Sequence, residues 1–133
     1  LLLDLMLELK DDFDLTYLFI THDLATAKYI CDRIGILYLG KIAEMADLND
    51  LYSKPLHPYT QALLAAVPIP DPHERRETPM PEGEIPNPIN PPSGCRFHPR
   101  CPIARDNCSV DEPELRELLP QHFVSCHYAE DFL

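Results

Sequence analysis

The distribution of proline divides this chain more sharply than any other feature of the sequence. The 133 residues include 15 prolines, all at or after Pro55, and nine of them fall between Pro68 and Pro92. Regular helices and central strands cannot run through that density, because each proline lacks a backbone N–H and has a fixed φ. We therefore expect an α/β part before Pro55, then a helical segment, a proline-rich connector and a cysteine-rich tail.

The residues before the first proline alternate between helical and strand-like patterns. Leu1–Asp12 predicts a helix whose leucines cover most of its circumference, with acidic residues along one stripe. Leu15–Ile20 is a short apolar run of β-branched and aromatic residues, which predicts a buried strand. Further elements are expected as a helix over 24–31, strands over 33–39 and 41–45, a short helix over 47–52, and a helix over 59–67 that Pro58 opens.

The predicted strand ends at Thr21-His22-Asp23. In open α/β sheets, ligands bind beyond the carboxyl ends of the strands, so His22 is a candidate ligand-contacting residue. Asp23 is the expected N-cap of the following helix. On these residues alone, a surface histidine at the end of a strand is the simpler interpretation of His22.

The charge of the chain limits its partners. Lys and Arg number 11 against 22 Asp and Glu, which gives a net charge of -11. Nucleic acids and anionic membrane surfaces attract basic proteins, so we expect no nucleic-acid partner and no direct adhesion to lipid headgroups. The sequence shows no signal peptide and no apolar run of transmembrane length. It begins without Met inside a helical pattern, from which we expect a fragment of a longer protein.

Four of the five cysteines are clustered with the spacing Cys-x5-Cys-x6-Cys-x17-Cys, namely Cys95, Cys101, Cys108 and Cys126. Without a secretion signal, such a cluster favours a metal over disulfides. Four thiolates can hold a tetrahedral zinc ion or an iron–sulfur cluster. The wide spacing, and the proline that follows Cys101, favour iron–sulfur, while zinc, disulfides and unlinked thiols remain as alternatives. Three histidines are weaker candidate ligands: His98, His122 and His127.

Two groups of residues resemble a known family. Leu18–Leu24, together with Cys31–Ile34 and Tyr38–Ile42, resembles the end of an ABC transporter ATPase domain and indicates only that superfamily. His57–Leu64 (HPYTQALL), followed by Phe97–Pro102 (FHPRCP), resembles the C-terminal extension of oligopeptide and dipeptide importer ATPases, a group that includes nickel importers.

The resemblance implies an α/β fold in three parts. Residues 1–53 would be the C-terminal fragment of a P-loop NTPase domain of the ABC type, residues 54–92 a helix with a proline-rich connector, and residues 93–133 a four-cysteine tail. His22 corresponds to the switch-loop histidine, which contacts the γ-phosphate of ATP and helps to position the attacking water. The clustered cysteines correspond to those that hold a [4Fe-4S] cluster.

The resemblance also implies an activity for the intact protein. It would be the ATP-binding subunit of an importer that couples hydrolysis of Mg-ATP to uptake of oligopeptides or dipeptides. It would lie on the cytoplasmic face of the membrane, bound to integral membrane permease subunits and paired with a second ATPase subunit. The Walker A, signature and Walker B motifs of the family do not occur in these residues, so the chain alone is expected to be inactive. The alternative is a stand-alone metal-binding interaction module, with iron–sulfur or zinc in its tail and no ATPase activity.

Overall fold

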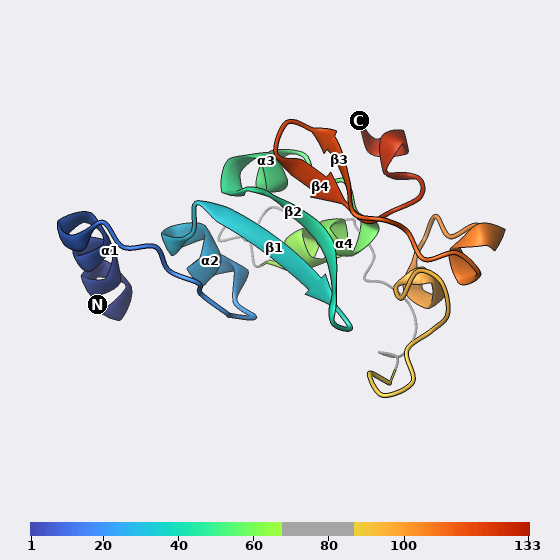
Figure 1. The fold of residues 1–133 in the computed structure, drawn as a ribbon, viewed down its shortest axis with the longest axis horizontal. Helices are drawn as coiled ribbons and strands as arrows, with labels where there is room; N and C mark the ends of the chain where they lie inside the picture. The colour runs from blue at the N-terminus through green and yellow to red at the C-terminus, as the bar shows by residue number, and fades with distance from the viewer. Residues whose placement is uncertain (68–86) are drawn as a thin grey trace, which may run out of the picture. The chain divides into compact units, whose positions relative to one another are not determined.

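The computed structural model describes residues 1–67 and 87–133, and these residues form two compact units, 1–32 and 33–133 (Figure 1). Most of the predicted proline-rich connector falls on residues 68–86, outside the described residues. None of the described helices is long and apolar enough to cross a membrane.

The first unit contains helices α1 (Leu2–Phe13) and α2 (Leu24–Ile30), both of which the sequence predicts. Helix α1 ends where Asp14 adopts a left-handed conformation, with φ 52°. Side-chain hydrogen bonds hold the unit together. The Lys10 ammonium donates to Asp32 at 2.6 Å, and the Tyr17 hydroxyl donates to the carbonyl of Met6 at 3.0 Å.

The predicted strand over Leu15–Ile20 is wrong for this structure. The segment is irregular, and Leu18 and Ile20 are 92% and 88% exposed. A buried strand needs neighbours whose N–H and C=O groups complete its hydrogen bonds, and no described residue pairs with this segment. The run therefore has a high β propensity, but no described strand pairs with it.

The second unit is built on one four-stranded sheet with the order β1-β2-β4-β3 (Figure 1). All of its pairings are antiparallel, and its strands are β1 (Arg33–Tyr38), β2 (Lys41–Asp47), β3 (Arg116–Leu119) and β4 (His122–Val124). The sequence predicts the first two strands, whereas β3 and β4 were not predicted. The sheet therefore joins the residues before the prolines to the end of the cysteine-rich tail.

The turn between β1 and β2 has positive φ at both central residues, Leu39 (47°) and Gly40 (79°). This is the pattern of the hairpin turns whose twist matches that of the flanking strands. The guanidinium of Arg96 donates to the carbonyl of Leu39 and so ties the turn to the tail.

Helices α3 (Leu48–Ser53) and α4 (Pro58–Ala66) follow the hairpin close to their predicted positions. Three short 3-10 helices lie in the tail: η1 (His98–Arg100), η2 (Asp106–Ser109) and η3 (Ala129–Phe132). A buried apolar cluster connects the tail to the residues before α4, and its members are Leu56, Val124, Cys126 and Ala129. The described residues thus combine helices with an antiparallel sheet, and the further division at residues 53 and 92 stays a prediction.

Candidate functional site

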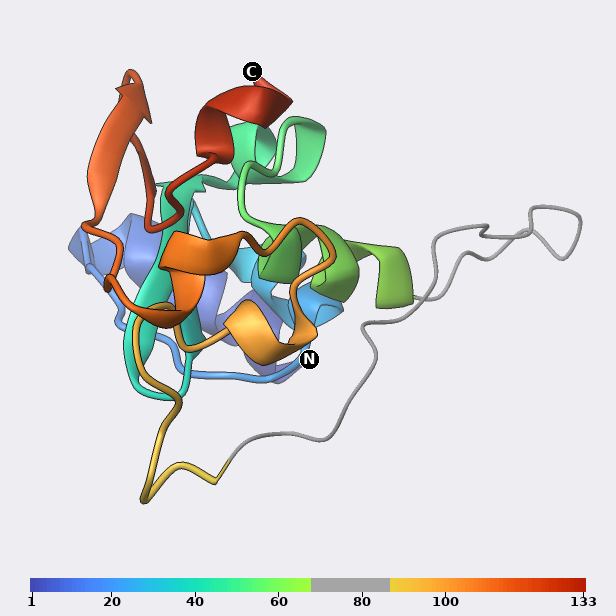
Figure 2. The ribbon, with the colours of Figure 1, turned by 90° about the vertical axis from the view of Figure 1, so that its right-hand side faces the viewer.

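The four clustered cysteines line one small hollow in the second unit, together with His57 and Pro58 at the start of α4. Figure 2 shows the orange ribbon of the tail beside the green ribbon of α4. Cys95 interacts electrostatically with Cys108, Cys101 with both of these, and Cys126 with all three. All four cysteines line the same hollow. Segments that are up to 31 positions apart in the chain, from Cys95 to Cys126, deliver their thiols to the same place.

Local backbone contacts fix Cys95 and Cys108. The N–H of Cys95 donates to the carbonyl of Cys108 at 2.8 Å, and the N–H of Arg105 donates to the Cys108 sulfur at 3.5 Å. His98 donates through Nδ1 to the carbonyl of Cys95 at 2.7 Å. Gly94 has φ 68°, a left-handed conformation that glycine adopts without strain.

The fourth cysteine reaches the hollow through the sheet. Val124 is fully buried opposite Glu44 in the β2–β4 ladder, and the N–H of Ser125 donates to the carbonyl of Ala43 at 2.8 Å. Cys126 follows directly and is 8% exposed. Pairing between strands β2 and β4 therefore determines where this thiol lies.

Burial changes the chemistry of the thiols. It raises the pKa of Cys95 and of Cys101 above the ordinary value for a thiol, and it raises the pKa of Cys126 to about 11. Desolvation disfavours the thiolate form, so these three thiols are protonated at neutral pH. A metal or cluster that binds here must displace these protons.

The remainder of the wall is mostly apolar and aromatic. Phe97 is 2% exposed and contacts the rings of Tyr38, Tyr59 and His57, with centroids 5.2, 5.4 and 5.9 Å away. Burial lowers the pKa of His57 to about 4, and its neutral Nδ1 accepts a hydrogen bond from the N–H of Tyr59 at 3.0 Å. His57 is thereby the N-cap of α4 as well as part of the wall.

The candidate metal ligands differ in how the structure places them. Among the described residues, no group of three or more His, Cys, Asp or Glu side chains is arranged to hold a metal ion. His98 and His127 line the hollow, but each has one ring nitrogen on a backbone carbonyl, of Cys95 and Asp111 respectively. His122, the third histidine considered from the sequence, lies elsewhere and donates through Nε2 to Glu44. The four cysteines therefore stay predicted ligands.

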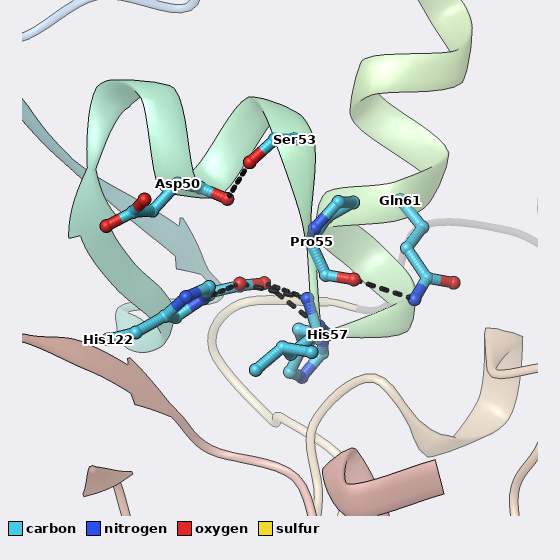
Figure 3. Close-up of polar contacts among 8 residues, drawn as sticks. Asp50, Ser53, Pro55, His57, Gln61 and His122 are labelled. Carbon is cyan, nitrogen blue, oxygen red and sulfur yellow. Dashed lines mark hydrogen bonds and ion pairs between the residues drawn. The ribbon is translucent and has the colours of Figure 1, made fainter. Parts of the chain in front are cut away.

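The sequence did not reveal the buried carboxylate of Glu44. Strand β2 reads as an alternating outer strand, yet Glu44 is completely buried. It accepts hydrogen bonds from the N–H groups of Leu56 and His57 and from the ring of His122. Figure 3 shows His122 and His57 on opposite sides of the hydrogen-bonded centre. A glutamate among apolar residues in a predicted strand was the one available signal.

His22 lies in the first unit, where its side chain is exposed immediately before α2. The predicted cap beside it is confirmed, because Asp23 Oδ1 accepts from the N–H groups of Ala25 and Thr26 at 3.0 and 3.4 Å. The Thr26 hydroxyl donates to Asp23 Oδ2 at 2.9 Å. The cap holds Asp23 in place, whereas the predicted role of His22 in contacting ATP is not tested by these contacts.

Comparison with known proteins identifies the group. Residues 43–108 match the family described as the oligopeptide/dipeptide transporter, C-terminal region. Over 123 residues, the chain is also 54% identical to a putative peptide import ATP-binding protein of Brucella ovis. The chain belongs to the oligopeptide/dipeptide transporter family. The family match includes Glu44, the segment from His57 to Leu64 and the first three clustered cysteines.

Two further relatives also have names that describe peptide transport. The chain is 50% identical over 127 residues to the oligopeptide transport ATP-binding protein AppF of Bacillus subtilis, and 49% identical over 126 residues to the putative oligopeptide transport ATP-binding protein YkfD of the same organism. These alignments and that with the Brucella ovis protein cover 92 to 94% of the chain and 38 to 39% of the relatives. The chain thus spans about two fifths of the length of these relatives.

Proposed function

We propose that the chain is the C-terminal part of an ATP-binding subunit of an importer for oligopeptides or dipeptides. The observation that carries this proposal is the 50 to 54% identity to peptide import and oligopeptide transport ATP-binding proteins over more than nine tenths of the chain. The intact subunit would couple hydrolysis of Mg-ATP to peptide uptake. It would lie on the cytoplasmic face of the membrane, bound to permease subunits and paired with a second ATPase subunit.

In this proposal, His22 contacts the γ-phosphate of ATP once the nucleotide-binding domain is complete. Its exposed position beside a well-formed cap supports this role, because the imidazole is available to a ligand while its neighbour Asp23 is fixed. An N–H donor at the γ-phosphate stabilises charge that grows in the transition state. The described residues of the first unit supply this one group and not the rest of an ATP site.

We also propose that Cys95, Cys101, Cys108 and Cys126 hold a [4Fe-4S] cluster. In a tetrahedral zinc site the thiolates must approach within about 3.8 Å of one another, since each Zn–S bond is about 2.3 Å. In a [4Fe-4S] cluster each thiolate binds a different iron, so the sulfurs can lie farther apart. The observation that supports this proposal is that all four cysteines line the same hollow. When bound, the cluster would cross-link the tail to the sheet.

Two measurements test these proposals separately. The complete subunit, reconstituted with permease subunits in vesicles, should take up short peptides only when ATP is supplied and hydrolysed. Uptake that does not depend on ATP would contradict the importer proposal. Anaerobic purification should yield about four irons and acid-labile sulfide per chain. One zinc ion without sulfide would contradict the cluster and indicate a zinc site. The same result is expected of a stand-alone zinc-binding module.

A further inference from the structure

The Glu44 carboxylate joins two segments that are far apart in the chain. Its Oε2 atom accepts from the N–H of Leu56 at 2.9 Å, and its Oε1 atom accepts from the N–H of His57 at 2.9 Å. From the other side, His122 donates its Nε2–H to Oε2 (Figure 3). Both Glu44 and His122 are almost entirely buried, with 0% and 1% exposure.

Each of the joined segments leads directly to the four-thiol hollow. His57 lines the hollow together with Pro58, the first residue of α4. His122 is the first residue of β4, and Cys126 follows the end of that strand. A single carboxylate therefore connects one wall of the hollow to the strand that precedes the fourth thiol.

A buried carboxylate at this place is costly unless hydrogen bonds compensate it. Here the compensation comes from both segments at once, so the carboxylate is satisfied only when they are in register. The opposite ring atom of His122, Nδ1, has no partner among the described residues, so Glu44 is the polar contact that orients the ring. Satisfied buried networks of this kind select one arrangement of the elements they join.

We propose that Glu44 is a positioning residue for the four-thiol site. Its carboxylate sets the location of Cys126 relative to the wall formed by His57 and Pro58, and thereby relative to the other three thiols. This inference rests on the proposed cluster. It means that Glu44, which is not part of the cysteine motif, helps to bring the fourth cysteine ligand into place.

The central test is the replacement Glu44→Gln in the 133-residue chain, purified anaerobically. Glutamine has nearly the same shape but presents an N–H₂ group where a carboxylate oxygen accepted, so one of the converging donors loses its acceptor. We expect the variant to lose the iron bound through Cys126, falling from about four irons to about three or fewer. Its electron paramagnetic resonance spectrum should match that of Cys126→Ser.

Two control variants separate positioning from general loss of stability. Glu114→Gln changes an exposed glutamate and should keep the iron content and the spectrum of the original chain. Leu51→Ala removes a fully buried side chain that does not line the hollow, and should lower the melting temperature without producing the Cys126→Ser spectrum. A Glu44→Gln variant with normal iron and a normal spectrum would overturn the proposal.

A second pair of variants covers the case in which Glu44→Gln does not fold. His122→Leu breaks only the contact from β4, and should give the same three-iron spectrum. His122→Gln keeps an N–H donor for the carboxylate and should restore part of the cluster. If His122→Leu retains a normal cluster, the carboxylate does not position Cys126 and the proposal fails.

The metal-free chain gives a readout that does not depend on the cluster. Cys126 should react slowly with an alkylating reagent, and at least about tenfold faster in Glu44→Gln, while Cys31 in the first unit reacts equally in both. Faster alkylation in a chain that never binds iron would refute the cluster and support the positioning role. Unchanged alkylation of Cys126 together with four bound irons would refute the positioning role and leave the cluster intact.

Discussion

Gly94 lies directly against the backbone of Cys108: a Cβ atom at Gly94 would fall 2.4 Å from the Cys108 carbonyl oxygen. The same carbonyl accepts the N–H of Cys95 at 2.8 Å. The backbone of Gly94 and Cys95 therefore packs directly against that of Cys108, which brings the residues Cys95 and Cys108 together. It also explains why a glycine precedes the first cysteine of the cluster.

Replacing Gly94 by alanine should therefore damage the hollow. The substitution combines a backbone clash with a left-handed φ, and we expect a loss of roughly 1–3 kcal/mol in the free energy of unfolding, together with reduced iron retention. Thermal unfolding and iron analysis measure both effects. Gly35→Ala is the matched control, because nothing lies within 4 Å of its Cβ position, and it should be nearly neutral. Equal effects of the two substitutions would contradict the packing described for Gly94.

Replacing His22 by alanine in the complete subunit should slow ATP hydrolysis about a hundredfold or more, as expected for loss of a donor to the γ-phosphate. ATP binding, measured separately by titration at low temperature, should change little, since other groups hold the nucleotide. The decisive result is a lower kcat with a nearly unchanged Kd for ATP. A variant that hydrolyses ATP at the original rate would remove His22 from the proposed site.

Replacing Asp23 by alanine should fray the start of α2. The carboxylate accepts from the N–H groups of Ala25 and Thr26, and hydrogen exchange at these two amides should accelerate in the variant. Asparagine, which also caps helices, should preserve most of the protection. If alanine and asparagine behave alike, the side chain of residue 23 does not cap the helix in solution.

The same cap should weaken in acid. The hydroxyl of Thr26, then the N–H groups of Thr26 and Ala25, lower the pKa of Asp23 below its ordinary value of 3.8. A lowered pKa in the folded state means that the carboxylate stabilises α2 above pH 3.8 and that this contribution is lost as the pH falls further. Amide protection at Ala25, corrected for intrinsic exchange, should drop over that range. A flat profile between about pH 5 and about pH 2, a range that spans the ordinary carboxyl pKa, would contradict this prediction.

Replacing Cys101 by serine should loosen the tail while the first unit remains folded. In the proposed cluster, Cys101 is one of four ligands that would cross-link η1, η2 and the strand that precedes Cys126, so proteases should cleave the tail of the variant faster. Limited proteolysis followed by mass spectrometry locates the new cuts. Cleavage in residues 1–32 serves as the internal control and should not change. A tail that is equally resistant in both proteins would argue against a structural metal or cluster.

Local features of this chain could be predicted from the sequence with some detail. The strand-like runs over β1 and β2, the proline that opens α4 and the Asp23 cap depend on residues within a few positions of one another, and the structure has all three. The motif from His57 to Leu64 and the cysteine spacing also pointed to the oligopeptide/dipeptide transporter family, which the family match shows. Such features are visible because their physical causes are themselves local.

Tertiary structure alone decided the rest. Leu15–Ile20 has the composition of a strand but is irregular and mostly exposed, because a strand forms only where partner strands complete its hydrogen bonds. Glu44 lies in a surface-like alternation but is buried, because donors from Leu56, His57 and His122 converge on it from distant segments. Pairing of β2 with β4 brings Cys126 to the other thiols. The sequence determined which residues could form the site, and contacts between distant segments decided which of them meet.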